Sequence, residues 1–163
     1  MNSRLMSPTN HPSIFYRIAT NTDASDIRKI IFDTLGAYGL NLDAAVTDSD
    51  LYDIEHYYPD GTFWVLVDEH DTIKGSFALY RENDKTVEIR KMYFDPSIRG
   101  LGLGIWAIHW LLQKAVSLGY HRAQLETASV LKEAIQLYKK MGFVEITGTC
   151  HSHRCDVLME KML

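Results

Sequence analysis

Cysteine and proline are scarce in this sequence, and neither sign of charge dominates it. The 163 residues include 2 Cys and 4 Pro, and the formal net charge is −4. A pair of cysteines does not make the disulfide framework of a small secreted domain, so a reducing, cytoplasmic location is the default expectation. The mixed charge leaves no basic footprint and predicts no nucleic-acid partner. No apolar run reaches membrane length, so we expect no membrane partner either.

The length of the chain fits one folded domain that can bury a proper core. Residues 1–13, MNSRLMSPTNHPS, lack the continuous apolar segment of a signal peptide. We see no internal repeat and no low-complexity tract. We therefore expect a short flexible lead-in over residues 1–12 and a single domain over residues 13–163.

The most informative stretch is residues 87–118, VEIRKMYFDPSIRGLGLGIWAIHWLLQKAVSL. β-branched and aromatic residues predict a strand over residues 86–94, and Asp95-Pro96 ends it. The turn RGLGLG follows, and apolar residues at helical spacing then predict a helix as far as Leu118. A glycine-rich turn that opens a helix presents unpaired backbone N–H groups and the positive end of the helix dipole. This pattern predicts an anion site that a phosphate can approach closely.

Periodicity predicts the remaining elements. Further strands are expected over residues 14–19, 62–67, 73–81, 123–127 and 143–146, and from residue 155 to 159 or beyond. Helices are expected from Thr22-Asp23 to Gly36 or Gly39, over residues 41–58 and over residues 131–141. The order is β-α-α-β-β-β-α-β-α-β-β. An antiparallel meander followed by a helical crossover to a parallel neighbour indicates a mixed α+β sheet.

Two motifs occur in fixed order, RGLGLG at residues 99–104 and AIQLYKKMGF at residues 134–143. The first resembles the acetyl-coenzyme A signature Arg/Gln-x-x-Gly-x-Gly/Ala of the GNAT superfamily of N-acetyltransferases. The second is similar to the A-x-x-L-Y-x-x-x-G-F segment of that family. The resemblance implies a GNAT-like α+β fold, a mixed, mostly antiparallel central sheet flanked by about four helices. It also implies an acetyl-CoA-dependent enzyme that acetylates a primary amine. Leu131 departs from the pattern, because many members carry Asn seven residues before the tyrosine.

The resemblance implies a site for acetyl-CoA as cosubstrate. Backbone N–H groups of the glycine turn would hold the pyrophosphate, and the end of the preceding strand would pair with the pantetheine amides, a form of strand addition. The cofactor-binding residues expected on this basis are Met92, Tyr93, Phe94, Arg99, Gly100, Leu101, Gly102, Leu103, Gly104, Ala134 and Tyr138.

Catalysis needs a proton donor for the leaving thiolate and a base for the incoming ammonium. The resemblance assigns the donor to Tyr138 and offers Glu88 as the base. Strand alternation would place Glu88, Arg90 and Met92 on one face. Glu88 could instead pair with Arg90 or with a lysine of a neighbouring strand as solvated surface. Alternative bases are His56, Tyr57 and Asp53. The amine would attack the thioester directly in a ternary complex, because neither cysteine lies in an evident activating setting.

The glycine turn also fits a dinucleotide-binding pattern, and the fold allows another function. Gly102, Gly104 and Ala107 satisfy the dinucleotide pattern, with Glu126 where a ribose-binding acid belongs. That fingerprint normally follows a very short turn, whereas residues 95–100 separate the strand from this glycine pair. A non-catalytic coenzyme A sensor on the same fold is the alternative function.

A cysteine and histidine cluster near the end of the sequence resembles a set of metal ligands. Cys150, His151, His153 and Cys155 could supply four ligands to zinc. Their spacing matches no common zinc pattern, so we expect no metal.

The sequence gives little information about the identity of the acceptor amine. Acidic residues between Asp43 and Glu55 hint at a cationic amine, such as a polyamine, an amino sugar or a peptide N-terminus. The partner expected is therefore a small-molecule or peptide amine. Whether copies of the chain form a homo-oligomer is left open.

Overall fold

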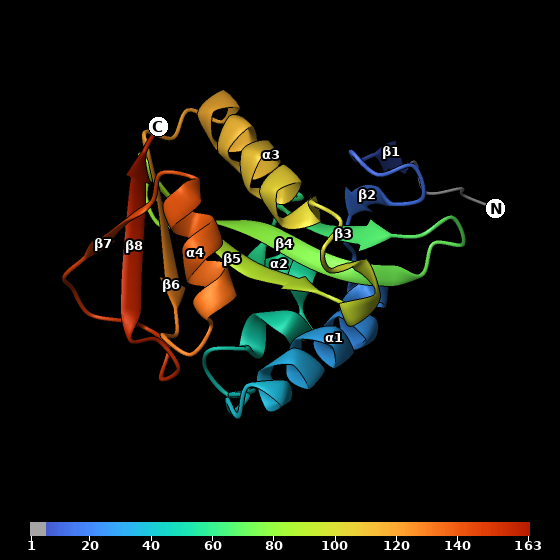
Figure 1. The fold of residues 1–163 in the computed structure, drawn as a ribbon, viewed down its shortest axis with the longest axis horizontal. Helices are drawn as coiled ribbons and strands as arrows, with labels where there is room; N and C mark the ends of the chain where they lie inside the picture. The colour runs from blue at the N-terminus through green and yellow to red at the C-terminus, as the bar shows by residue number, and fades with distance from the viewer. Residues whose placement is uncertain (1–5) are drawn as a thin grey trace.

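The computed structural model describes residues 6–163, which form a central sheet with helices on both faces (Figure 1). The strands are β1 (Ser7–Pro8), β2 (Phe15–Ile18), β3 (Phe63–Val67), β4 (Ile73–Arg81), β5 (Thr86–Phe94), β6 (Arg122–Thr127), β7 (Val144–Ile146) and β8 (Val157–Met162). The α-helices are α1 (Ala24–Ala37), α2 (Ile54–Tyr57), α3 (Leu103–Ser117) and α4 (Lys132–Lys140). Short 3₁₀ helices are η1 (Asn21–Asp23), η2 (Ser49–Tyr52) and η3 (Pro96–Ile98).

The sheet has the strand order β1-β2-β3-β4-β5-β6-β8-β7. Neighbouring strands are antiparallel except β5 and β6, which are parallel and joined through α3. A parallel pair needs such a crossover because a tight turn can only reverse the chain. The mixed, mostly antiparallel sheet predicted from the sequence is therefore confirmed.

The parallel pair β5 and β6 separates along its length. The ladder between them runs from Thr86↔Arg122 to Glu88↔Gln124, although β5 continues to Phe94. Among the described residues, the second half of β5 is therefore paired with β4 only. This leaves one row of its backbone groups facing the gap between the two strands.

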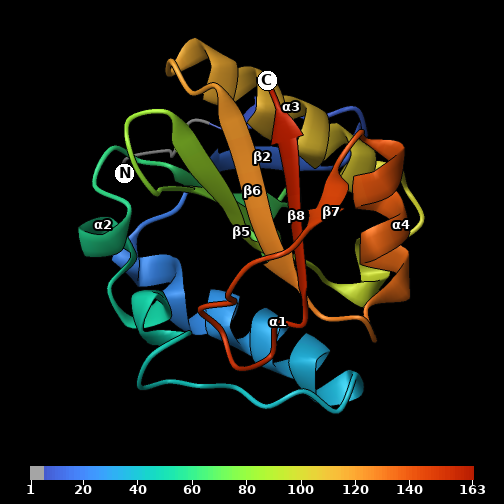
Figure 2. The same ribbon diagram turned by 90° about the vertical axis from the view of Figure 1, so that its left-hand side faces the viewer.

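Two apolar layers cover the sheet, one on each face (Figure 2). Helices α3 and α4 pack on one face, where Ile108 and Leu111 are fully buried. Helix α1 packs on the other, with Ile27 and Ile31 fully buried. Within the described part of the chain, no helix is long and apolar enough to cross a bilayer.

The helix predicted over residues 41–58 is wrong. The chain there forms turns, then η2, then the single-turn helix α2. Asp43 accepts hydrogen bonds from the N–H groups of Val46 and Thr47, and Asp48 accepts one from the N–H of Asp43. Side-chain bonds to nearby backbone groups compete with helix formation, which explains the broken segment.

A bulge in β5 interrupts the alternation of its side chains, so the prediction that Glu88, Arg90 and Met92 share one face is wrong. Ser76 faces Tyr93 and Ala78 faces Arg90, so β5 carries one extra residue at this point, and Lys91 has a φ of 54°. Met92 therefore packs with the α3 side of the sheet, whereas the guanidinium of Arg90 lies on the other face, 3.6 Å from the centre of the Tyr80 ring. A bulge reverses the side-chain pattern beyond it.

Part of the predicted lead-in lies within the described residues. Ser7 and Pro8 pair with Tyr16 and Phe15 of β2. Residues 1–5 lie outside the described part, and the division into a lead-in and one domain remains a prediction.

Candidate active site between the separated strands

A cavity of about 300 Å³ lies beside the end of β5 and the start of α3. All the predicted cofactor-binding residues except Leu101 line it. Leu101 is 40% exposed at the outside of the turn. The remaining lining comes from Ile98 of η3, from Thr34 and Tyr38 of the α1 region, and from the α4 region, where Leu131, Glu133 and Leu137 contribute. The cavity thus brings together the two motifs, residues 99–104 and 134–143, which are separate in the sequence.

The glycine turn takes the conformation that its composition predicts. Gly100 and Gly102 both have a φ of 77°, in the left-handed region that favours glycine. A Cβ atom on Gly104 would lie 3.1 Å from Leu137 and 3.4 Å from Phe94, so this glycine permits close packing of α3. The first N–H groups of α3 have no partner within the helix. Gly102, Leu103 and Gly104 line the cavity at this point, which suits an anionic ligand.

A second cavity, of about 250 Å³, adjoins the first. Its floor is residues 88–93 of β5. Its walls come from the end of β6, from the loop between β7 and β8, and from Leu35, Leu40, Val46 and Thr47. The two cavities share five lining residues, which are Met92, Tyr93, Leu131, Ala134 and Tyr138. Two ligands that enter from different sides can therefore meet at Tyr138.

Tyr138 lies on α4 at the junction of the cavities and is 7% exposed. Burial, with a smaller contribution from Tyr93, raises the pKa of the phenol above its ordinary value of 10. The hydroxyl therefore keeps its proton throughout the neutral pH range. A buried, protonated phenol can donate a proton to a basic leaving group.

Glu88 lies on the floor of the second cavity with its side chain 8% exposed. Burial, and then its neighbour Glu82, raise the pKa of Glu88 to about 7, although Arg90 acts in the opposite direction. Arg90 Nη2 donates to Glu88 Oε2 at 2.9 Å and lies 3.5 Å from Glu82 Oε1. The pairing with Arg90 considered in the sequence analysis is present, yet Glu88 is buried rather than solvated. A carboxylate that titrates near neutrality is suited to act as a base.

The alternative bases lie elsewhere. Asp53 caps α2 by accepting a hydrogen bond from the N–H of His56, and it binds the side chain of Asn21. The rings of His56 and Tyr57 pack against each other on the same exposed segment. Neither cavity described above is lined by these three residues.

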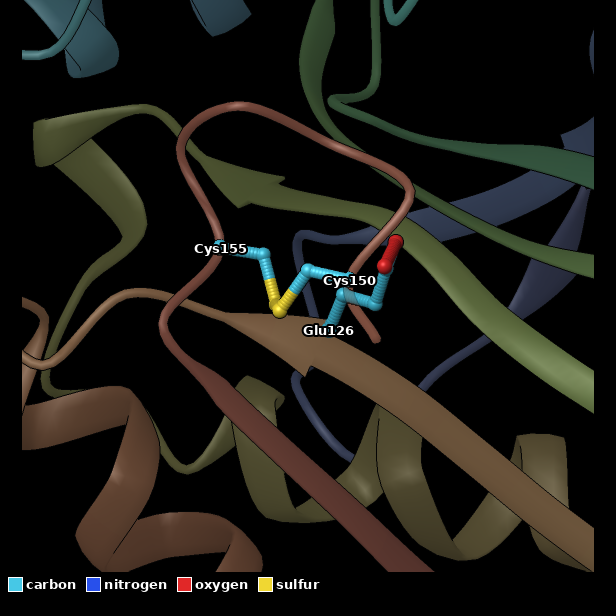
Figure 3. Close-up of side chains that lie close together, drawn as sticks. All are labelled: Glu126, Cys150 and Cys155. Atoms are coloured by element: carbon cyan, nitrogen blue, oxygen red, sulfur yellow. A yellow bond between two sulfur atoms is a disulfide. The ribbon is translucent and has the colours of Figure 1, made fainter. Parts of the chain in front are cut away.

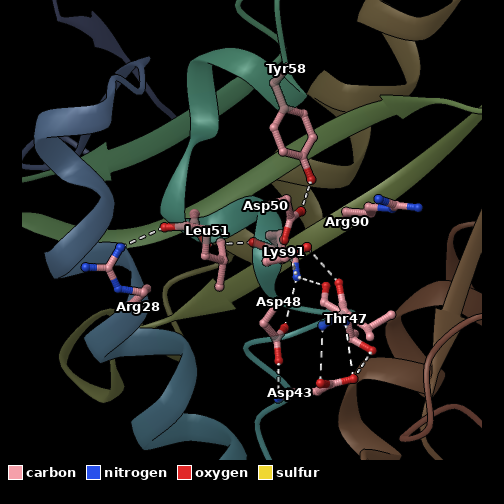
Figure 4. A network of polar contacts seen from close by, with 12 residues as sticks. Arg28, Asp43, Thr47, Asp48, Asp50, Leu51, Tyr58, Arg90 and Lys91 are labelled. Atoms are coloured by element: carbon pink, nitrogen blue, oxygen red, sulfur yellow. Dashed lines mark hydrogen bonds and ion pairs between the residues drawn. The ribbon is translucent and has the colours of Figure 1, made fainter.

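A buried polar network under the second cavity was missed by sequence reasoning (Figure 4). Lys91 Nζ lies 3.0 Å from Asp48 Oδ1 and 3.1 Å from Asp50 Oδ1. Asp48 also binds both terminal nitrogens of Arg154, at 2.8 and 3.0 Å. Burial acts to raise the pKa of Asp48, but Arg154 and Lys91 outweigh it and hold that pKa below its ordinary value.

The network weakens the argument that the acidic residues between Asp43 and Glu55 bind a cationic acceptor. Two of the carboxylates between Asp43 and Glu55 are Asp48 and Asp50, which are buried and paired with Lys91. These charges are neutralised inside the protein. In the sequence, only the apolar neighbour Leu51 indicates that Asp50 is buried, and this indication is weak.

Cys150 and Cys155 form a disulfide in the loop between β7 and β8 (Figure 3). The sequence alone does not predict this pair, because two cysteines in a chain expected in a reducing compartment give no signal for a disulfide. Glu126 of β6 lies beside the two sulfur atoms, and its carboxylate accepts a hydrogen bond from the N–H of His151. In the disulfide form the sulfur atoms are not available as thiolate ligands for a metal.

The sequence is similar to those of several proteins that are named as N-acetyltransferases. A family model described as the Acetyltransferase (GNAT) family matches residues 28–143. An uncharacterized N-acetyltransferase of Escherichia coli, YjgM, is 33% identical over 156 residues, which cover 90% of this chain and 93% of the relative. Human N-acetylaspartate synthetase is 33% identical over 106 residues, 63% of this chain and 35% of that protein.

Solved structures share the fold. A GNAT-family acetyltransferase from Staphylococcus aureus superposes with a TM-score of 0.83 at 20% identity, covering 92% of this chain and 99% of that one. The acetyltransferase yncA from Salmonella typhimurium, solved with its cofactor acetyl-CoA, has a TM-score of 0.69 at 23% identity and covers 92% and 94%.

Proposed function

The chain belongs to the GNAT family and is an N-acetyltransferase, and on this premise we propose that its two cavities bind acetyl-CoA and a primary amine together. The observation that carries the proposal is the junction of the cavities at Tyr138. Direct transfer needs both substrates in one complex, with the amine close to the thioester carbonyl.

Acetyl-CoA occupies the cavity lined by the glycine turn in this proposal. The N–H groups of residues 99–104 and the N-terminal end of α3 hold the pyrophosphate. The pantetheine arm lies along Met92, Tyr93 and Phe94, where β5 has separated from β6 and has backbone groups to pair. Leu131, in place of the Asn of many members, lines both cavities and offers no polar contact.

The amine occupies the second cavity and reaches Glu88 with its proton still bound. Glu88 accepts that proton, and the neutral amine then attacks the thioester carbonyl, forming a C–N bond. A backbone N–H group of the bulged part of β5 stabilises the oxyanion of the tetrahedral intermediate. The intermediate collapses as its C–S bond breaks, and Tyr138 donates a proton to the leaving thiolate. The nitrogen loses its second proton, which restores the phenol of Tyr138, and Glu88 releases the first proton to solvent. The amide, coenzyme A and one proton together account for all atoms of the two substrates.

The acceptor is a small-molecule or peptide amine, and the enzyme works in the cytoplasm in this proposal. The second cavity contains Glu88 and Glu126 as well as Arg90 and Arg154. It therefore suits an amine that carries further polar groups. The name of the human relative records aspartate as the amine that that protein acetylates, so aspartate belongs in any acceptor screen.

A thermal-shift titration with acetyl-CoA, with NADH and zinc as controls, tests cofactor binding first. A ligand at 100 times its Kd stabilises the folded state by about 2.7 kcal/mol, enough to raise Tm by several degrees. An assay of coenzyme A release with a panel of primary amines follows. A shift with NADH or zinc alone would contradict the proposal. A shift with acetyl-CoA but no turnover with any amine would favour a coenzyme A sensor.

A further inference from the structure

The loop between β7 and β8, residues 147–156, forms one wall of the proposed acceptor cavity and is closed on itself by the disulfide. His151, Ser152, Arg154 and Cys155 of this loop all line the cavity. Both cysteines are partly exposed. A small thiol in solution can therefore reach the disulfide, and its reduction would act directly on the cavity wall.

The residues inside the disulfide ring attach the loop to two other parts of the protein. The N–H of His151 donates to the carboxylate of Glu126 on β6. Arg154 donates to Asp48 from both terminal nitrogens and to the carbonyl oxygen of Asn41 at 3.2 Å. Figure 2 shows the loop extending from the β7–β8 edge toward α1. The ring thus connects the end of β6 to the segment over residues 41–48, and both contribute residues to the wall of the cavity.

We propose that Cys150 and Cys155 are a redox modification site whose oxidation state controls the order of this loop and, through it, acceptor binding. The part concerning the acceptor rests on the function proposed above. In the disulfide form the short ring restricts the loop and keeps Arg154 at Asp48. In the dithiol form the loop opens more often, because its side-chain contacts, those of Arg154 and His151 among them, then hold it without the restraint of the ring.

The chemical step is thiol–disulfide exchange with a low-molecular-weight thiol of the glutathione class. A thiolate of that class attacks one sulfur of the pair, the S–S bond breaks, and the other cysteine leaves as a thiolate that takes a proton. A second thiol attacks the mixed disulfide and releases the first cysteine. Two external thiols are oxidised to one disulfide, and the protein gains two electrons and two protons. In the cytoplasm, such disulfides are usually transient and redox-sensing, which fits a site of this kind.

The cofactor cavity provides an internal control. None of the residues that line it comes from residues 147–156. A change in the loop should therefore alter binding of the acceptor but not of acetyl-CoA. A general loss of stability would instead affect both substrates.

Hydrogen exchange of the full-length protein tests the redox site without knowledge of the acceptor. The protein is compared after treatment with glutathione disulfide and after reduction with excess glutathione, alongside the double variant Cys150→Ser/Cys155→Ser. The chain has 2 cysteines, so the double variant has no thiol left to react. We expect amides of residues 147–156 and 41–48 to exchange about tenfold faster in the reduced protein and in the variant, with α3 unchanged. Equal exchange in the oxidised and reduced protein would overturn the proposal.

Kinetics separate this inference from the proposed function. The best acceptor is chosen from a panel containing L-aspartate, spermidine and glucosamine. Reduction should raise its KM about fivefold or more while the KM of acetyl-CoA stays the same, and the double variant should not respond to either treatment. Turnover with unchanged acceptor KM would overturn the link to acceptor binding. Absence of turnover in both redox states would contradict the proposed function, and the exchange data would still decide whether the loop responds.

Discussion

Asp48 and Arg154 are 106 residues apart in the chain, yet two nitrogens of the Arg154 guanidinium donate to the Asp48 carboxylate at 2.8 and 3.0 Å. Asp48 belongs to the segment before η2, and Arg154 to the loop between β7 and β8. The pair therefore joins two walls of the proposed acceptor cavity. Asp48 is fully buried and also binds Lys91 of the bulge in β5. Its carboxylate therefore connects the segment before η2 and the loop between β7 and β8 to β5.

Replacement of Asp48 by Asn should destabilise the protein strongly. The substitution keeps the shape of the side chain but removes the charge that compensates Lys91 and Arg154 in a buried setting. Breaking a buried ion pair by removing one partner typically costs about 3 kcal/mol or more. Urea denaturation should show a loss of that order in the unfolding free energy. Asp33→Asn is the matched control, because its ion pair with Lys29 is exposed. Equal stability of the two variants would contradict the structural role of Asp48.

Replacement of Tyr138 by Phe should reduce kcat by about 10²-fold, the usual contribution of a general acid. The ring stays in place, so the affinity for acetyl-CoA should change little. Steady-state kinetics and a thermal-shift titration measure the two quantities separately. Tyr120→Phe is the control, because Tyr120 packs against the same core but lines neither cavity. Unchanged turnover in Tyr138→Phe would remove the phenol from the mechanism.

Replacement of Gly102 by Val should weaken acetyl-CoA binding. Gly102 has a φ of 77°, which a β-branched residue rarely adopts, and a side chain there would crowd the phosphate. Calorimetric titration should give a higher Kd. Gly36→Ala serves as the control, because a Cβ at Gly36 in α1 meets no atom within 4 Å. Wild-type affinity in Gly102→Val would contradict the proposed place of the pyrophosphate.

Local patterns were sufficient to predict most of the fold. The strands β4 and β5 begin and end where alternation and turn residues placed them, at Ile73–Arg81 and Thr86–Phe94. The strand-turn-helix unit and the motif around Tyr138 also indicate the family from the sequence alone. These features are encoded by neighbouring residues, which is why periodicity and short motifs reveal them.

The parts that were missed depend on contacts between distant segments. Lys91 became an extra residue of β5 because of its register with β4 and its ion pairs with Asp48 and Asp50. The disulfide between Cys150 and Cys155 depends on how their loop folds back beside Glu126. A single sequence carries no pattern for such pairings, so neither the bulge nor the buried network could be read from it.

Replacement of Glu88 by Gln should lower kcat/KM and remove the acidic limb of its pH profile. Burial and the nearby Glu82 raise the pKa of Glu88 to about 7, so the wild-type base is increasingly protonated, and inactive, as the pH falls below that value. The wild-type rate should therefore rise with pH up to an apparent pKa of about 7 and then level off. Circular dichroism at each pH checks that the variant remains folded. An unchanged acidic limb in Glu88→Gln would assign the base to another group.

Replacement of Glu82 by Gln should move that acidic limb to lower pH without removing it. Glu82 shares Arg90 with Glu88, and it disfavours ionisation of Glu88 first through a side-chain hydrogen bond and then through its negative charge. Loss of this charge lowers the pKa of Glu88, but burial is the larger cause of the shift and persists, so the pKa should not return fully to its ordinary value of 4.5. The plateau rate at pH 8 should be retained, because Glu88 is ionised there in both proteins. Profiles of kcat/KM between pH 5 and pH 9 measure the shift, and a displacement toward higher pH would show that Glu82 does not act on Glu88 through its charge.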